Sequence, residues 1–317
     1  MKVPEAIFEI GLNHMGDVKR AIRMVDTLCA QGATHITIQA VTDFSTTMRD
    51  TATAKAVQPN CLSLKEVIAV IRHGQGLGAI MGVAVLDPDH ITSFVEAGAR
   101  FFKVLSSDLT YTPLHIILVR TGLPCYLSTG LAMLEDITRS IELIRTAEPK
   151  ADIRLIHTVL KIPTPAQMLN LNNILFLIKK YNIPVAYGQH SDIPDALLAA
   201  TAIGAETVFV YVAEEASPQL PDGPHAMLCR DVKVLLQQLV RVRIMSGTKE
   251  RVLSAEEQER RVSIRRSVVA AVPIKKGEHI TMEKIAFKRP GTGYAPWDLP
   301  KVLGSPARKN YSPDEDI

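Results

Sequence analysis

The chain has 317 residues, of which 47% are hydrophobic and 22% charged, so it is long enough for one large domain plus a small one with a full hydrophobic core. Its 36 lysines and arginines exceed its 33 acidic residues by only three, which argues against nucleic acid or a membrane surface as a partner. It lacks a signal-peptide pattern and a membrane-length apolar run, and its four cysteines are widely spaced, so we expect a cytoplasmic protein with reduced thiols.

Short apolar runs alternate with amphipathic helix patterns from residue 6 to about residue 247. The eight runs begin at Ile7, His35, Ala79, Arg100, Pro124, Asp152, Pro184 and Thr207. Such alternation is typical of a parallel sheet, and eight units over about 240 residues match a (β/α)8 (TIM) barrel, an α/β fold. An open doubly wound sheet is the alternative, but the number of units and the lack of a GxGxxG motif after the first strand disfavour it. We therefore predict a barrel over residues 1–247.

The composition changes after residue 247. Residues 248–262 are rich in charge and lack aromatic side chains, so we interpret them as a linker, in part helical. Residues 263–317 contain short β-branched runs broken by turn residues, as in a small β-rich domain. A domain of about 55 residues has little core of its own, and we expect it to lean on another surface.

Polar side chains gather where the predicted barrel strands end, which is where barrels bind their ligands. Glu9 and Lys103 lie inside apolar runs, where an unpaired charge is costly, so a role in the barrel lumen is favoured for both. His157 is interpreted as a core histidine. For His190 a metal ligand and a loop hydrogen bond are equally supported, and Ser128 either binds phosphate or caps a helix.

Several ordered motifs resemble the sialic acid (N-acetylneuraminate or nonulosonate) synthase family. They are EIGLNHMGD at residues 9–17, FFKVLSSDLTYTPL at 101–114, YLSTGLAMLEDI at 126–137, GQHS at 188–191, RRSVVAAVPIKKGEHIT at 265–281 and FKRPGTG at 287–293. The resemblance spans nearly the whole chain, and its last two motifs are similar to the family's antifreeze-protein-like (SAF) domain. It implies a carbon–carbon bond-forming transferase that condenses phosphoenolpyruvate with an N-acylated amino sugar to a nonulosonic acid. It also implies a domain-swapped homodimer and a divalent cation, manganese or magnesium.

The resemblance assigns roles to particular residues. Glu9 matches the catalytic carboxylate near the attacking water, and His190 matches a metal ligand. Lys103, Ser106 and Ser128 match phosphate-binding positions. Substrate contacts are implied for Asn13, His14, Gln39, Asp108 and, from the partner's tail, Arg289.

The chain departs from the family pattern at the phosphate and metal positions. Thr37 stands where the family has a phosphate-binding lysine, and Tyr211 where it has a second metal-binding histidine. Further donors are replaced by Ala84, Leu160 and Gly188. Each charge-assisted contact contributes roughly 1.5–3 kcal/mol, so the combined loss predicts weak phosphate and metal binding.

Three functions follow from these observations. The first is an active synthase with a rearranged site, in which Glu214, Glu215, Asp222 or His225 completes a metal site and Lys161 adds charge near Leu160. The second is a catalytically degenerate family member that binds a ligand or a partner. The third is an aldolase-like or lyase reaction that uses Lys103.

Overall fold

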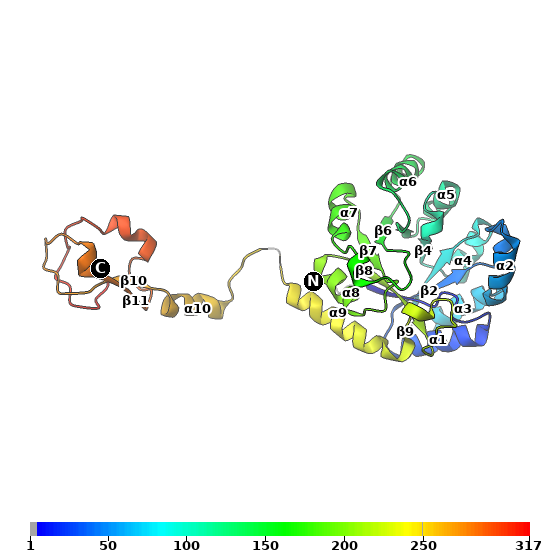
Figure 1. Ribbon diagram of the computed structural model, residues 1–317, viewed down its shortest axis with the longest axis horizontal. Helices are drawn as coiled ribbons and strands as arrows, with labels where there is room; N and C mark the ends of the chain where they lie inside the picture. Colours follow the sequence, from blue (N-terminus) through cyan, green and yellow to red (C-terminus); the bar gives the residue numbers. More distant parts are fainter. Residues whose placement is uncertain (1–4, 249) are drawn as a thin grey trace. The chain divides into compact units, whose positions relative to one another are not determined.

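The computed structural model describes residues 5–248 and 250–317 (Figure 1). The chain divides into two compact units after Gly247, and each is described by itself. Within the described residues, no helix combines the length and the apolar character needed to cross a membrane.

Eight parallel strands form the first unit. They are β1 (Glu5–Glu9), β2 (His35–Ala40), β3 (Ile80–Val85), β4 (Phe101–Val104), β5 (Cys125–Ser128), β6 (Ile153–His157), β7 (Val185–Gly188) and β8 (Thr207–Ala213). Each strand pairs with the next one in the chain, and β8 pairs with β1, which closes the sheet. The predicted TIM barrel is confirmed, and the open sheet is wrong. A short strand, β9 (Met227–Leu228), adds to β8.

Helices surround the barrel (Figure 1). They are α1 (Val18–Ala30), α2 (Thr51–Val57), α3 (Leu64–Gly76), α4 (Ile91–Ala97), α5 (Thr112–Arg120), α6 (Leu134–Ala147), α7 (Asn173–Tyr181), α8 (Asp195–Ile203) and α9 (Val232–Ser246). In α1 the apolar residues Ala21, Met24, Val25 and Leu28 recur every three or four positions, and all are buried. This spacing gives the helix one apolar face, which packs on the sheet.

The barrel lumen is apolar toward the amino ends of the strands and polar toward their carboxyl ends. Its apolar cluster consists of Ile7, Phe101, Tyr126, Ile156, Ala186 and Phe209. Gly82 is needed in this cluster, because a Cβ there would overlap the Phe101 ring. Above it, the register pairs Glu9 with Thr37 and Tyr211, and Ala84 with Lys103. Ionisable side chains from distant parts of the chain thereby share one level of the barrel.

Over its described residues, 248 and 250–317, the second unit contains one α-helix and a small antiparallel sheet. Helix α10 (Ala255–Ile264) starts at a capping box, in which the Ser254 hydroxyl accepts a hydrogen bond from the backbone N–H of Glu257. The expected linker therefore includes most of a helix. Strand β10 (Ser267–Ala270) pairs with β11 (Ile285–Lys288), and this sheet packs on a core of its own. That core contains Val268, Ala270, Ile274, Ile280, Ile285, Val302, Ala307 and Tyr311.

Candidate active site

A cavity of about 200 Å³ lies at the carboxyl ends of the barrel strands. We call it the mouth cavity. Its lining includes the predicted site residues Glu9, Gln39, Lys103, Ser106, Ser128 and His190, together with Thr158, Leu160, Tyr211 and Asp222. The fold therefore brings together residues that are spread over more than two hundred positions of sequence, from β1 to the segment after β8.

Glu9 and Lys103 form a buried ion pair at the base of this cavity. The Lys103 Nζ lies 2.6 Å from Glu9 Oε1 and 2.5 Å from Oε2, and Glu9 is completely buried. Lys103 Nζ also lies 5.2 Å from the Phe209 ring centre and 5.3 Å from that of Tyr211. Among the described residues that line the cavity, Lys103 is the only lysine or arginine. Its charge is already compensated, so the cavity presents little positive charge to an anionic ligand.

The predicted serine positions lie beside this pair. Ser128 is buried, and its Oγ has no hydrogen-bond partner among the described residues. Ser106 approaches the turn after β5, where a Cβ at Gly130 would lie only 2.6 Å from the Ser106 Oγ. Asp108 does not line the cavity; it accepts a 3.2 Å hydrogen bond from Ser107 Oγ, and burial raises its pKa. A buried, unpaired hydroxyl such as that of Ser128 is a ready partner for a ligand.

Asn13 and His14 do not line the mouth cavity. Asn13 Nδ2 donates a 2.8 Å hydrogen bond to Val212 O, and its Oδ1 accepts one of 2.9 Å from the Asp222 N–H. The side chain thus ties the segment after β1 to the segment after β8. His14 is buried, accepts a 3.1 Å hydrogen bond from the Gly16 N–H, and burial lowers its pKa to about 4. Their predicted contact with substrate stays a prediction.

Three aromatic rings pack together on one side of the mouth. The ring centres of His190 and Tyr211 are 5.5 Å apart, those of His190 and His225 5.1 Å, and those of Tyr211 and His225 4.8 Å. Burial lowers the pKa of His190 to about 4 and that of His225 to about 3. Burial, followed by the charge of Glu9, raises the pKa of Tyr211 well above its ordinary value. All three rings are therefore uncharged at neutral pH.

These residues do not fit the divalent cation that the resemblance implies. Across residues 5–248 and 250–317, no three His, Cys, Asp or Glu side chains are placed to hold a metal ion. The Tyr211 phenol keeps its proton and is a poor substitute for an imidazole ligand. His190 Nδ1 lies 3.0 Å from both Val159 O and Thr158 Oγ1, so only Nε2 of this ring is left for a ligand, and a single imidazole is a poor site for manganese.

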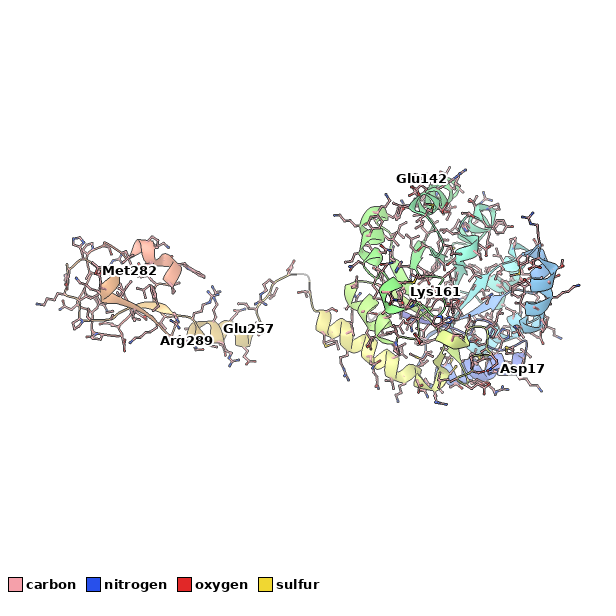
Figure 2. The ribbon with its side chains drawn as sticks, in the orientation of Figure 1. Asp17, Glu142, Lys161, Glu257, Met282 and Arg289 are labelled. Atoms are coloured by element: carbon pink, nitrogen blue, oxygen red, sulfur yellow. The ribbon has the colours of Figure 1, made fainter. Side chains whose placement is uncertain are left out.

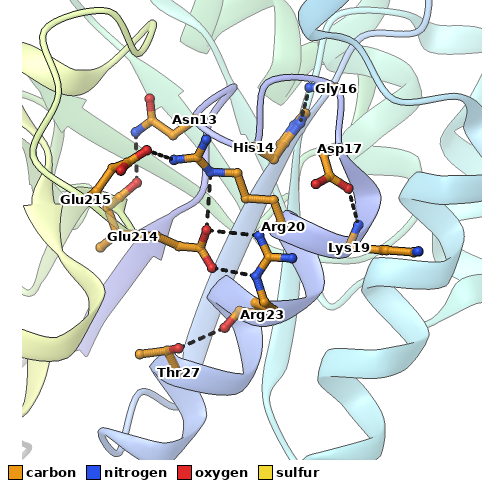
Figure 3. Close-up of polar contacts among 11 residues, drawn as sticks. Asn13, His14, Gly16, Asp17, Lys19, Arg20, Arg23, Thr27, Glu214 and Glu215 are labelled. Atoms are coloured by element: carbon orange, nitrogen blue, oxygen red, sulfur yellow. Dashed lines mark hydrogen bonds and ion pairs between the residues drawn. The ribbon is translucent and has the colours of Figure 1, made fainter.

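The acidic pair after β8 is held by helix α1 instead (Figure 3). Glu214 lies 3.3 Å from Arg20 Nε and 3.0 Å from Arg23 Nε, and Glu215 lies 2.9 Å from Arg20 Nη2. Neither carboxylate lines the mouth cavity. The expectation that this pair could complete a metal site is therefore not supported, because both side chains are engaged with arginines.

Three further residues lie away from the mouth cavity. His157 is buried, and its Nε2 is 2.8 Å from Leu169 O, in agreement with a core histidine. Lys161 lines a neighbouring cavity of about 450 Å³ between the segments after β5 and β6, and it is labelled in Figure 2. Arg289 is exposed directly after β11 in the second unit (Figure 2).

Asp222 is the main residue of the mouth for which no definite role could be predicted from the sequence. Burial raises the pKa of its carboxyl to about 6, and the Glu9 charge acts in the same direction. Its Oδ2 accepts a 3.3 Å hydrogen bond from the Leu12 N–H, which lowers the pKa. Gly11 permits this approach, because a Cβ there would overlap Asp222 Oδ2. An acid with this pKa could exchange protons with a ligand near neutral pH.

Asp222→Asn is expected to stabilise the protein at pH 7.5 and to change little at pH 4. Because the folded pKa is raised, the folded carboxyl binds its proton more tightly than the unfolded one, so stability falls as pH rises from about 4 to about 6. The full effect corresponds to roughly 3 kcal/mol, and we expect about 1–3 kcal/mol. Melting temperatures of both proteins across this range measure it. The pKa values of His190 and His225 are lowered by burial, so their contribution to stability rises with pH over this range. Each variant is therefore compared with the unmodified protein at the same pH. Exposed Asp192→Asn is the control, and an equal gain there would contradict the argument.

Comparisons with known proteins agree with this architecture. Residues 18–251 match the NeuB family model, and residues 265–317 match the SAF domain. The chain is 26% identical to the N,N'-diacetyllegionaminic acid synthase of Campylobacter jejuni, covering 100% of this chain and 99% of that protein. It is 29% identical to an uncharacterized protein of Methanocaldococcus jannaschii, covering 98% and 92%.

The structure is also similar to a solved synthetase. The N-acetylneuraminic acid (sialic acid) synthetase of Leptospira borgpetersenii, solved in complex with citrate, superposes with a TM-score of 0.77 at 25% identity. The match covers 82% of this chain and 90% of that one. Since the family model spans most of the barrel and the SAF domain follows it, the chain belongs to the NeuB family.

Proposed function

We propose that this protein binds a sugar-derived ligand in its mouth cavity and does not condense it with phosphoenolpyruvate. It would then be a catalytically degenerate member of a family of nonulosonic acid synthases. The observation that carries the proposal is the ion pair between Lys103 and Glu9, which compensates the one lysine of the cavity.

Phosphoenolpyruvate carries a phosphate and a carboxylate, and the mouth has little to hold them. Thr37, at the family's lysine position, is completely buried, and its Oγ1 has no partner among the described residues. Glu9 and Lys103 neutralise each other, and the Asp222 carboxyl adds negative charge nearby when it is ionised. An anion that enters a buried site without a free cation loses its hydration without compensation. Tight binding of phosphoenolpyruvate is therefore not expected.

The same lining suits hydroxyl and amide groups. Ser106, Ser107, Ser128, Thr158 and Gln39 offer donors and acceptors around one cavity, and Leu160 and Ile162 offer apolar contact. Uncharged polar groups with some apolar surface are what a small sugar-derived molecule needs. An amino sugar therefore fits this mouth better than a phosphorylated acid.

The second candidate is the synthase reaction itself, favoured by the alignment with a named legionaminic acid synthase over the whole chain. In that case Glu9 would act beside the attacking water, and Lys103 would have to leave Glu9 in order to hold phosphate. A divalent cation would supply electrophilic activation of the sugar aldehyde in such a reaction. The residues around His190 do not fit that cation, so we place this candidate second.

Calorimetry with separate ligands distinguishes the two candidates. We expect no saturable heat with millimolar phosphoenolpyruvate or manganese, and a saturable signal with N-acetylmannosamine. The Campylobacter jejuni synthase serves as the positive control for phosphoenolpyruvate and manganese. Turnover of phosphoenolpyruvate with any N-acylated amino sugar by the unmodified protein would overturn the proposal in favour of the second candidate.

We also propose that the protein is a cytoplasmic homodimer. No residue of α10 is buried within its own unit, and Ile264 in this helix is an exposed apolar side chain. Exposed apolar surface of this kind marks protein contacts. Light scattering at micromolar concentration should give twice the chain mass. If Arg289 reaches the partner's mouth cavity, Arg289→Ala should also weaken sugar binding. A monomer would contradict both.

A further inference from the structure

The second unit contains a basic groove of its own. It has a volume of about 780 Å³ and lies between residues 251–266 and the turn after β11. Its lining includes Arg251, Arg261, Arg265, Arg266 and Trp297. We call it the arginine groove. Every residue that lines it belongs to the second unit.

Within the described part of the chain, none of the four guanidinium groups is in a direct ion pair with a carboxylate; the charge of Arg251 acts on Glu257 of helix α10 without such a contact. The acidic residue in the lining, Asp298, is bonded to Lys301 at 2.6 Å. Arg266 Nη1 donates a 3.2 Å hydrogen bond to Phe287 O, which leaves its other donors free. Four guanidinium groups in one groove, none held in a direct ion pair, repel each other and attract a multiply charged anion.

The groove also presents the one tryptophan of the chain. Trp297 is 72% exposed, and the Arg265 guanidinium carbon lies 5.4 Å from the ring centre. An exposed indole is unusual for its size, and its flat face suits another flat ring. A phosphate alone would gain nothing from this side chain.

Backbone contacts hold the two sides of the groove together. The Gly291 N–H donates a 2.7 Å hydrogen bond to Val262 O, which ties the turn after β11 to helix α10. A Cβ at Gly291 would lie only 2.8 Å from the Arg265 Cβ, so glycine is needed for this close approach. The arginines of α10 and the tryptophan are therefore held on one frame.

We infer that the arginine groove binds a nucleoside polyphosphate. The guanidinium groups would hold the phosphates through paired N–H donors, and the base would stack on Trp297. The volume of the groove lies in the range of small-molecule sites. A long nucleic acid is disfavoured, because the chain has a net charge of only +3 and the arginines lie in one bounded groove.

Intrinsic fluorescence tests this inference directly, since Trp297 is the only tryptophan. We expect ADP to quench the full-length protein saturably, and adenosine and pyrophosphate each to bind at least tenfold more weakly. Arg251→Gln combined with Arg261→Gln should weaken ADP binding about tenfold or more, whereas Arg308→Gln, an exposed arginine outside the groove, should not. Unchanged melting temperatures would show that the variants fold.

Besides contact of the groove with a second copy, four ligand-binding results would overturn the inference. They are no quenching by millimolar ADP, equal ADP binding by the double variant, pyrophosphate binding as tight as ADP, and tighter binding of a single-stranded oligonucleotide than of ADP. The third result would indicate a simple anion patch, and the fourth a nucleic-acid partner. Quenching that depends on protein concentration without ligand would instead assign the groove to contact with a second copy.

Discussion

Lys103→Met is expected to lower the free energy of unfolding by about 3–5 kcal/mol, because it leaves the Glu9 carboxylate buried without its cation. Glu9 is completely buried at the centre of the barrel, and Lys103 holds both of its oxygens. For a chain of this size the loss corresponds to a fall in melting temperature of roughly 5–8 °C. Thermal and urea unfolding would measure it.

A second variant separates lost charge compensation from lost packing. Glu9→Gln combined with Lys103→Met removes both charges and should recover most of the stability. The control is Lys301→Met, which breaks an exposed ion pair with Asp298 and should leave the melting temperature unchanged. A double variant as unstable as Lys103→Met would show that packing, not charge, is responsible.

The same ion pair bears on function. If Lys103 were available to a phosphate group, inorganic phosphate would stabilise the unmodified protein by mass action. We expect no such stabilisation at millimolar phosphate, because Glu9 already occupies the ammonium group. The ion pair therefore links the stability of the barrel to its weak affinity for phosphorylated ligands.

The barrel could be predicted from the sequence because its signal is local and repeated. Each lumen strand is a short apolar run, and the polar ends of these runs mark the rim. The partner of each polar side chain could not be predicted in the same way. Glu9 and Lys103 are 94 positions apart, and only the register of a closed sheet places them in contact. The sequence did contain one signal for this contact, because it places one acidic and one basic residue inside two apolar strands of the barrel.

Other side chains have partners that the sequence could not show, for a similar reason. Glu214 and Glu215 stand at a strand end, where carboxylates often bind metals, but Arg20 and Arg23 on α1 lie within reach. The substrate contact of Asn13 stays a prediction. Both ends of its side-chain amide form hydrogen bonds with backbone groups, those of Val212 and Asp222. A strand-end position shows that a side chain lies near the rim. It does not show whether that side chain already has a hydrogen-bond or ion-pair partner within the protein.

The largest expected change in binding comes from restoring the family's residues at three positions together. Thr37→Lys alone is expected to fail, because Thr37 pairs in register with Glu9 and a new ammonium group there would share that carboxylate with Lys103. Apolar Leu160 would still line the mouth, and Tyr211 would still stand beside His190. No metal ligand is added by the single change.

Thr37→Lys, Leu160→Asn and Tyr211→His in one chain should produce measurable binding of both manganese and phosphoenolpyruvate by calorimetry. One new cation, one new amide donor and one new imidazole act on the same ligands, and each charge-assisted contact is worth roughly 1.5–3 kcal/mol, so affinity should rise at least a hundredfold. Adding His190→Ala to this variant is the matched control and should abolish manganese binding. If Thr37→Lys alone restored phosphoenolpyruvate binding, the missing charge would be the sole defect. If the triple variant bound neither reagent, the mouth cavity would have diverged beyond these three positions, and the degeneracy would lie in its shape.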